Sequence, residues 1–177
     1  DSLHEFLVKS DKKIDNKLQI AMAGYKLKNT LSDKGAVTRG VSIGNEENKL
    51  VDIIETHEIK LEEDGSLSSK EGLDSDLLNL ESLVSMNLWA SYPVFIDLCE
   101  EHFIKYLEEN KDKLDSAEYV LPDMIGELIE EEKADITILP TEEKWIGITY
   151  KEDLSPAKAS FKKMFEENLY PEDIWNL

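Results

Sequence analysis

The sequence predicts an α/β or α+β domain with a mixed sheet, and three observations support this fold class. Short segments such as 19–27 and 83–89 are largely apolar, as buried strands are. Residues 44–48 join two strand-like segments through a turn that contains Gly and Asn, which is a β-hairpin signal. Residues 93–110 instead repeat apolar positions at spacings of three and four, as one face of a helix does. Strands followed by helices with further strands among them are typical of α/β proteins.

The first half of the chain predicts one helix and several strands. We expect a helix over 1–10, strands over 19–27, 39–43, 49–54 and 83–89, and a short strand over 58–61 closed by the Asp64-Gly65 turn. Residues 66–81 are rich in Ser, Asp and Glu and predict a loop with a helical turn at 75–79.

The second half predicts three helices and two strands. The expected order is helix 93–110, helix 118–132, strand 135–139, strand 145–150 and helix 155–167, followed by a tail over 170–177 in which Trp175 docks on the body. Pro93 suits the first turn of its helix, where a missing N–H costs nothing, and Ser116 is expected to cap the next helix. The helix at 93–110 has an apolar stripe made of Phe95, Leu98, Cys99, His102, Phe103 and Tyr106.

Composition limits the classes of partner. The chain has 177 residues and a formal net charge of −19, which argues against binding to nucleic acid or to an anionic membrane. No apolar run approaches the about 18 residues of a membrane span. The single cysteine excludes an intrachain disulfide and a cysteine-based zinc site, and we expect a cytoplasmic protein. Because residue 1 is Asp, we expect a chain that was processed or cut from a longer one.

Common catalytic motifs are absent from the sequence. There is no glycine-rich phosphate loop, no Gly-x-Ser-x-Gly elbow and no His-Glu-x-x-His. His102 lies on an apolar stripe, so we interpret it as a histidine at the edge of the core, and Cys99 as a buried thiol. His4 and His57 are expected at the surface.

Three polar residues lie where a strand predicts burial or a strand end. Ser85 and Asn87 alternate within the apolar strand 83–89, so each needs a hydrogen-bond partner or a ligand. Glu55 ends the segment Leu-Val-Asp-Ile-Ile, where a carboxylate can bind sugar hydroxyls or simply face water; the residues alone leave both open.

Four segments, in this order, carry a family resemblance: 37–41, 50–55, 84–89 and 143–153. Together they resemble the C-terminal part of the sugar-nucleotide nucleotidyltransferases, the NDP-sugar pyrophosphorylases, and the similarity runs over nearly all of the chain. The resemblance implies a GT-A-like, Rossmann-related fold with a mixed sheet flanked by helices. It also implies joining of a nucleoside triphosphate to a sugar 1-phosphate, with Mg²⁺ and release of pyrophosphate. Such an in-line attack depends on positioning and on charge neutralisation.

The resemblance assigns substrate-binding roles to Gly40, Glu55 and Asn87. Gly40 matches a glycine that passes close to the sugar, Glu55 a glutamate that binds sugar hydroxyls, and Asn87 a position in the strand that lines the pocket. Two positions depart from the family. Thr56 replaces a lysine that contacts phosphate, and Gly147 replaces an aspartate that binds the metal. Asp153 is displaced from that position, so we name neither a metal ligand nor a catalytic residue.

The segments that match place residues 1–177 in the sugar-binding, C-terminal portion of the family's domain, without its nucleotide-binding half. We therefore expect this chain alone to be inactive and to hold no cofactor. In the family, strands of the nucleotide-binding half pair with this part of the sheet. Without them we expect an exposed sheet edge, and exposed edges favour self-association.

Two alternatives remain open: a non-catalytic or regulatory sugar-nucleotide-binding module of the same fold, and an interaction domain without a ligand. A Gly-x-Gly-x-Arg-like loop about a hundred residues upstream would favour the enzyme.

Overall fold

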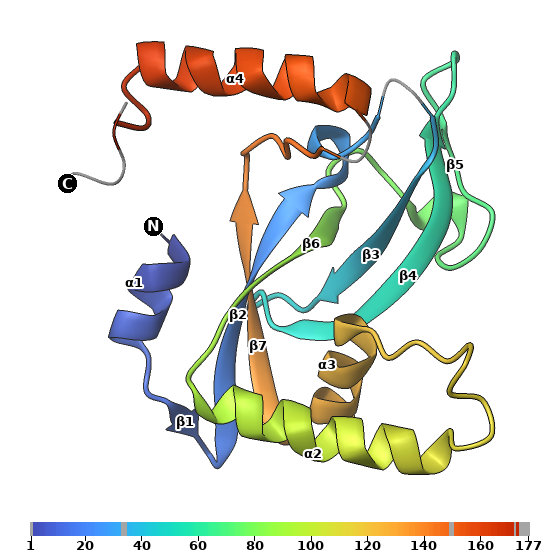
Figure 1. Cartoon of the computed structure of the whole chain (residues 1–177), viewed down its shortest axis with the longest axis vertical. Coiled ribbons are helices and arrows are strands. Elements are labelled where there is room, and N and C mark those ends of the chain that lie inside the picture. The colour runs from blue at the N-terminus through green and yellow to red at the C-terminus, as the bar shows by residue number, and fades with distance from the viewer. Residues whose placement is uncertain (1, 33–34, 149–150, 172, 174–177) are drawn as a thin grey trace. The chain divides into compact units, whose positions relative to one another are not determined.

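The computed structural model describes residues 2–32, 35–148, 151–171 and 173. The chain divides into two compact units, Asp1–Glu143 and Lys144–Leu177. The first unit contains the sheet and three α-helices, and the second contains one α-helix (Figure 1). This confirms the mixed α/β class, with a sheet that is largely antiparallel. No helix among the described residues has the length and apolar character needed to cross a bilayer.

Within the described residues, seven strands form one sheet in the order β1-β2-β6-β3-β4-β5, with β7 also paired to β2. Their bounds are β1 Lys13–Ile14, β2 Lys17–Lys26, β3 Val37–Gly44, β4 Leu50–Leu61, β5 Leu67–Ser68, β6 Leu83–Ala90 and β7 Ala134–Thr141. The β2–β7 pair is parallel and the other pairs are antiparallel, so the sheet is mixed, as expected.

The hairpin formed by β3 and β4 turns back onto β7, so the sheet is strongly curled (Figure 1). The predicted turn is confirmed, and its backbone is held by the Asn45 side chain, which accepts hydrogen bonds from the N–H groups of Glu47 and Lys49. The Ile138 N–H then donates to the Asn48 carbonyl at 2.7 Å. Lys49 Nζ donates to Thr137 Oγ1 at 3.0 Å. These contacts join the strand at one side of the sheet to the hairpin at the other.

Two helices cover the main core. They are α2 Val94–Glu109 and α3 Leu121–Glu130, which follow each other between β6 and β7 (Figure 1). The fully buried members of this core come from β2, β4, α3 and β7, namely Leu18, Ile20, Met22, Leu50, Met124, Ile125, Leu128, Ala134, Ile136 and Ile138. Burying each large aliphatic side chain contributes about 1.5–3 kcal/mol, so this core holds β7 against β2 and α3 against both.

A second cluster lies under the loop that joins β4 to β6. It consists of the buried residues Leu27, Val41, Ile59, Leu78 and Val84. The loop includes β5 and a short helical turn at Ser75–Leu77, as the sequence predicts at 75–79. This cluster holds the loop, through Leu78, against β3, β4 and β6.

β4 is one long strand, whereas the sequence predicts two strands at 49–54 and 58–61. The two halves are joined by Glu58, which has a φ of 53°. Here the register with β3 slips, so that Val37 faces Ile59 while Arg39 faces Thr56. This extra residue is a β-bulge, which bends the strand without ending it.

β6 is less buried than a fully apolar strand, which corrects the interpretation of 83–89. Val84 and Ser85 are buried, but Asn87 and Leu88 are exposed. The register with β2 slips between Ser85 and Trp89, and Asn87 has a φ of 55°. The chain bulges here, because a non-glycine residue with positive φ cannot continue a regular strand.

The helices differ from the predictions mainly at their ends. The first helix, α1 Ser2–Lys9, lies close to its expected range. In α2 His102 is the buried residue and Phe103 is 48% exposed, so the expected apolar stripe is wrong at Phe103. Pro93, expected in the first turn, is the N-cap of α2, and the helix begins at Val94. α3 starts three residues later than expected, and its N-cap is Val120 rather than Ser116.

The second unit contains the short 3₁₀ helix Lys151–Asp153 and α4 Leu154–Glu166, close to the predicted 155–167. The strand expected at 145–150 is wrong over residues 145–148, which form no strand. Trp145 folds over Gly147 there, and a Cβ on that glycine would meet the indole ring at 1.8 Å. Residues 149–150, and the expected docking of Trp175, lie outside the described residues.

Candidate functional site

Two of the three expected substrate-binding residues are neighbours across the sheet. Gly40 on β3 lies directly opposite Glu55 on β4, and on its other side it lies opposite Ser85 on β6. Directly opposed residues point to the same face of a sheet. The structure therefore brings Glu55, Gly40 and Ser85 together in one row.

Apart from Glu55, this row consists of small, buried residues. Ser85 also faces Gly24 on β2, so two glycines and a serine lie side by side. A Cβ at Gly40 would lie 3.1 Å from the Cδ1 of Ile53 and 3.7 Å from Oε2 of Glu55. A Cβ at Gly24 would lie 2.6 Å from Cγ2 of Ile138, so a side chain at Gly24 would disturb the core.

Glu55 is exposed in the middle of β4, not at a strand end as expected. Arg39 is a basic residue whose charge interacts with that of Glu55. Burial lowers the pKa of Arg39, and the negative charge of Glu55 opposes this change. The guanidinium donates to Thr30 Oγ1 at 3.2 Å and to the Thr38 carbonyl at 2.8 Å, which holds it in place. The site thus has a carboxylate in water with a positive charge beside it.

Sequence reasoning missed Arg39. It lies next to Gly40 in the segment 37–41, but neither a motif nor the resemblance drew attention to it. Its link to Glu55 comes from the β3–β4 register, in which Arg39 and Thr56 are opposed and Glu55 is the next residue. A hairpin register derived from the turn at 44–48 was the signal from which it could have been found.

Asn87 does not belong to the row. It lies on the bulge of β6, and its side chain is exposed. Its backbone N–H donates to Ser85 Oγ at 3.2 Å, which gives the buried serine its partner. The expectation of an inward-facing Asn87 is therefore wrong, while its role in binding a substrate stays a prediction.

Thr56, which replaces the lysine of the family pattern, has a structural role. It is completely buried. Its hydroxyl donates to the Ile54 carbonyl at 3.0 Å and accepts from the Leu73 N–H at 3.1 Å. These bonds fix the loop after β5 against β4, so a long basic side chain does not fit there.

None of the described residues forms a group of three or more His, Cys, Asp or Glu side chains arranged to hold a metal ion. Gly147, at the position where the family has an aspartate, has no side chain. We therefore derive no step through a metal.

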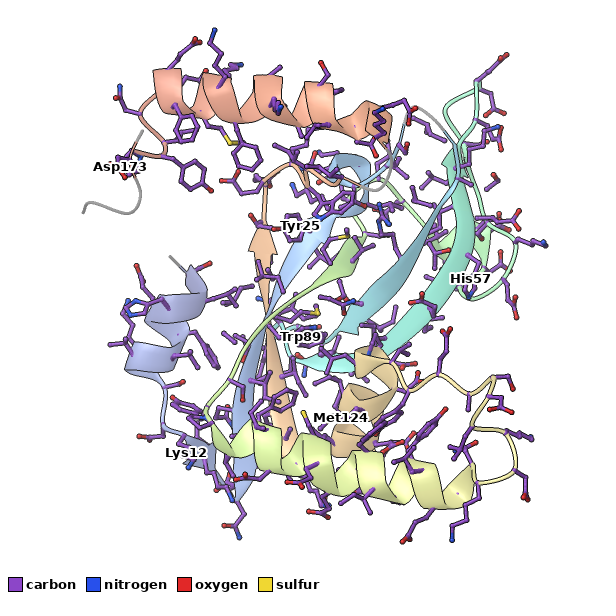
Figure 2. The ribbon with its side chains drawn as sticks, in the orientation of Figure 1. Lys12, Tyr25, His57, Trp89, Met124 and Asp173 are labelled. Atoms are coloured by element: carbon purple, nitrogen blue, oxygen red, sulfur yellow. The ribbon has the colours of Figure 1, made fainter. Side chains whose placement is uncertain are left out.

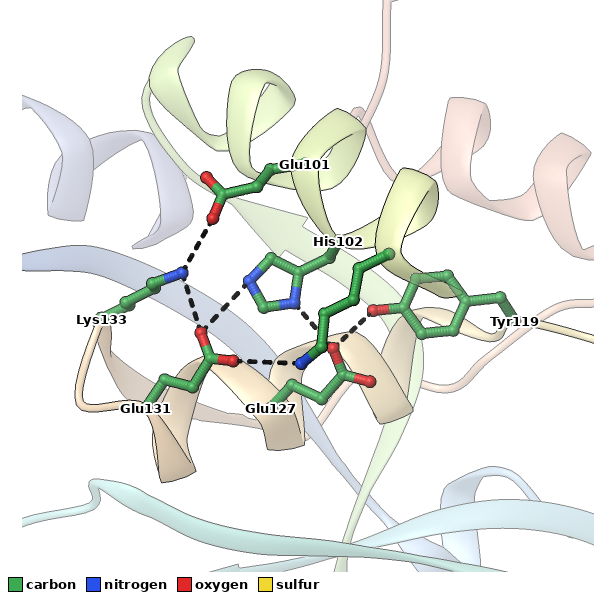
Figure 3. Close-up of polar contacts among 7 residues, drawn as sticks. Glu101, His102, Tyr119, Glu127, Glu131 and Lys133 are labelled. Atoms are coloured by element: carbon green, nitrogen blue, oxygen red, sulfur yellow. Dashed lines mark hydrogen bonds and ion pairs between the residues drawn. The ribbon is translucent and has the colours of Figure 1, made fainter. Parts of the chain in front are cut away.

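A separate polar network joins α2 to α3 around His102 (Figure 3). His102 is 2% exposed, as expected for a histidine at the core edge. Its Nδ1 donates to Glu127 Oε2 at 2.7 Å, and the same oxygen accepts from the Tyr119 hydroxyl at 2.9 Å. Its Nε2 lies 3.5 Å from Oε2 of Glu131. Each ring nitrogen therefore faces a carboxylate of α3.

Lysines complete this network at its outer side. Lys133 lies 2.8 Å from Glu131 and 3.1 Å from Glu101, and Lys105 lies 3.5 Å from Glu131 (Figure 3). The hydrogen bond from Lys133 lowers the pKa of Glu131. Burial, with the nearby Glu127, raises the pKa of Tyr119. Among the described residues His102 Nε2 makes no hydrogen bond, so the 3.5 Å approach to Glu131 is the weaker of its two contacts. The contacts between the two helices fit a role in holding α2 on α3.

No protein-family model matches the chain, and no curated protein matches it. Any function is therefore inferred from the geometry and from the resemblance of the four segments.

Proposed function

We propose that this chain is a binding module for a hydroxylated small molecule of the sugar-nucleotide class, with Glu55 and Gly40 at the centre of its site. The observation that carries the proposal is the position of the exposed Glu55 carboxylate directly across from Gly40. A carboxylate accepts hydrogen bonds from neighbouring hydroxyls, and such charge-assisted bonds are stronger than neutral ones. Gly40, Ser85 and Gly24 are themselves buried, so a ligand contacts the exposed carboxylate of Glu55 and not the backbone of these residues.

The charge around the site favours the sugar part of the ligand as the contacting group. The net charge of the chain is −19, so a phosphate needs local basic groups. Arg39 is the cation beside Glu55, and its guanidinium is already engaged with Thr30 and Thr38. Thr56 is buried where the family has a phosphate-binding lysine. This is the reason to prefer a module over a complete catalyst.

A calorimetric titration with sugar 1-phosphates and nucleotide sugars tests the proposal. We expect at least one of these ligands to bind, and Glu55→Gln to weaken binding about tenfold, because a hydrogen bond to a charged group is lost. Glu47→Gln, at an exposed position in the β3–β4 turn, is the matched control and should bind as the wild type does. Equal affinity of the two variants, or no binding across the panel, would overturn the proposal.

The second candidate is the sugar-binding portion of a nucleotidyltransferase with a GT-A-like fold. The order of the four segments 37–41, 50–55, 84–89 and 143–153 favours it. In that case a nucleoside triphosphate, a sugar 1-phosphate and Mg²⁺ act in the intact cytoplasmic enzyme, and the nucleotide-binding half lies outside these residues. We expect no pyrophosphate release by the purified chain. Turnover of a nucleoside triphosphate with a sugar 1-phosphate would show that the chain is catalytic by itself.

Self-association is part of the same proposal. Among the described pairings, the outer side of residues 50–55 in β4 has no neighbouring strand. Asp52 Oδ1 accepts the Ile53 N–H at 2.7 Å and thereby covers one donor of this edge. We expect a dimer by light scattering at high protein concentration, and more dimer for Asp52→Ala. A monomer for both proteins at every concentration would count against an edge contact.

A further inference from the structure

The side of α2 that does not pack on the main core carries large apolar side chains; we call it the outer face of α2. The helix lies along one margin of the first unit (Figure 1). Ile96 is 67%, Phe103 48% and Ile104 51% exposed, and Leu107 is half-buried. The spacing 96, 103, 104 and 107 places these side chains on one face of a helix. A contiguous apolar surface of this kind, unlike scattered single residues, marks an interaction site.

Carboxylates are interspersed with these apolar side chains. Glu100 lies within the apolar row, four residues after Ile96, and Asp97 and Glu108 lie one row further round the helix, on either side of Ile104. All three carboxylates are exposed, and none has an ion pair or hydrogen bond among the described residues. The outer face therefore offers apolar contacts and free negative charge side by side.

At the N-terminal end of α2 the outer face continues into a depression of about 360 Å³. The depression is lined by Trp89, Ser91, Tyr92, Pro93, Phe95 and Ile96. Trp89 is on β6 (Figure 2), so the depression joins the end of that strand to the first turn of α2. Ile96 belongs both to this lining and to the outer face, which makes the apolar surface continuous. Depressions of this kind take the apolar anchor residues that carry most of the energy of an interface.

The aromatic parts of this surface are already held in place. The ring of Phe103 stacks on Tyr119, with ring centroids 6.4 Å apart and an interplanar angle of 16°. The hydroxyl of Tyr92 donates to the Ser10 carbonyl at 2.6 Å, which ties its ring to the end of α1. A partner would therefore meet a formed surface, and ordering that surface would cost little of the binding energy.

The charge of the outer face selects the partner. Covering its carboxylates removes them from water, which is costly unless the partner supplies cations. Lys105, the one lysine of α2, cannot supply them, because it already lies 3.5 Å from Glu131. A second copy in a two-fold contact would set these carboxylates against themselves, and the net charge of −19 adds general repulsion. The same charge disfavours nucleic acid and anionic membranes. The complementary surface is apolar and basic.

We propose that the outer face of α2 binds an amphipathic helix of another protein that carries lysine or arginine beside its apolar residues. Apolar side chains of that helix pack on Ile96, Phe103 and Ile104, and one anchor enters the depression. Its cations pair with Glu100 and Asp97. Helices recognised in this way use anchors at spacings of three, four and seven residues. α2 has 16 residues and is about 24 Å long, so it accommodates a partner segment of about four turns. The proposal does not depend on the proposed sugar site.

The probe is a fluorescein-labelled helical peptide of about four turns, with Leu at spacings of three and four and Lys elsewhere. Its fluorescence anisotropy is measured against the full chain at about 0.15 M salt, where attraction between distant charges is largely screened. We expect saturable binding. Ile96→Ser should weaken it about tenfold, because an apolar anchor contact is lost. Val8→Ser is the matched control, since Val8 on α1 is 69% exposed, and it should leave binding unchanged.

Charge reversal separates local pairing from general attraction. Glu100→Lys should weaken binding about tenfold, because it replaces an ion pair by repulsion at the centre of the interface. Glu46→Lys, at an exposed position in the β3–β4 turn, changes the net charge equally and should bind the peptide as the wild type does. A second peptide with the same Leu and Lys composition, but with no apolar face in its sequence, should bind about tenfold more weakly.

These substitutions replace exposed side chains, and circular dichroism checks that each variant folds. The proposal is overturned if the amphipathic peptide does not bind saturably, if Ile96→Ser binds as tightly as Val8→Ser, or if the two charge reversals weaken binding equally. Equal binding of the two peptides would also overturn it, since attraction by charge alone would then suffice. A wild-type dimer by light scattering that Ile96→Ser converts to monomer would assign the outer face to a second copy instead, and would equally refute a basic partner helix.

Discussion

The His102–Glu127 pair permits a quantitative test of what holds α2 on α3. The perturbations are His102→Ala, Glu127→Ala and the double variant. The imidazole is 2% exposed and its Nδ1 lies 2.7 Å from Glu127 Oε2. Removing it deletes a hydrogen bond to a charged group and leaves a cavity, so we expect a loss of about 2–4 kcal/mol in the free energy of unfolding.

The coupling energy between His102 and Glu127 should be smaller than the total loss of stability caused by His102→Ala. The Glu127 side chain is 37% exposed, so water screens it and replaces part of the lost bond. Taking the low end of the range for hydrogen bonds to charged groups gives a coupling energy of about 1–1.5 kcal/mol.

Urea unfolding followed by circular dichroism at neutral pH measures all four proteins of the cycle. His4→Ala is the control, because His4 is exposed on α1, and it should change stability by less than about 0.5 kcal/mol. A coupling energy below about 0.3 kcal/mol would show that the short contact does not stabilise the helix pair. A His102→Ala loss no larger than the His4→Ala loss would refute the core role of the histidine itself.

Three other substitutions test the packing and charge described above. Gly24→Ala should lower the free energy of unfolding by about 1–3 kcal/mol, because its Cβ would lie 2.6 Å from Cγ2 of Ile138. Gly126→Ala, on α3 with nothing within 4 Å of the new Cβ, should instead raise it by about 0.5–1 kcal/mol; urea unfolding distinguishes the two, and equal effects would contradict the packing argument. Lys133→Gln removes the hydrogen bond that lowers the folded-state pKa of Glu131. That lowered pKa contributes stability above the unfolded-state pKa of glutamate, which is lost as the pH falls through the folded-state value. Unfolding measured from pH 7 down to pH 3 should therefore depend less on pH in Lys133→Gln, and an unchanged slope would exclude this contribution.

Local patterns in the sequence predict most elements because the apolar residues of most helices and strands follow a single spacing from end to end. The ranges expected at 19–27, 93–110 and 155–167 lie close to β2, α2 and α4. The hairpin turn is also predicted, since Gly44 and Asn48 are local signals for it. Their sequence patterns are local, although β2 itself pairs with β1, β6 and β7.

The bulges could not be predicted in the same way. Glu58 and Asn87 adopt positive φ without being glycines. Glu58 has no sequence signal for this, and Asn is enriched at positive φ but is too common elsewhere to mark a bulge. The bulge at Glu58 turns two expected strands into one, and the bulge at Asn87 turns an expected inward side chain outward. Both are imposed by register with a neighbouring strand, which a single sequence does not display.

The candidate site and the buried polar groups illustrate the same limit. The adjacency of Gly40 and Glu55 follows from a hairpin register and was expected from the resemblance, whereas the charge of Arg39 beside Glu55 was not. The buried polar atoms of Trp89 and Ser91 have no partner among the described residues, and nothing in the sequence shows this. Only the packed structure shows which polar groups are satisfied.

The contact between the β3–β4 hairpin and β7 has a consequence for the order in which the protein folds. Lys49 and Thr137 are 88 residues apart in the chain. Closing a loop of that length costs about 4 kcal/mol of chain entropy before any contact across it is gained. The hairpin is local and can form early, but the curl of the sheet closes only once β7 has paired with β2. A chain emerging from the ribosome thus exposes the hairpin tip until the last strand has been made, and folding of the first unit is expected to be slow and to depend on that final strand.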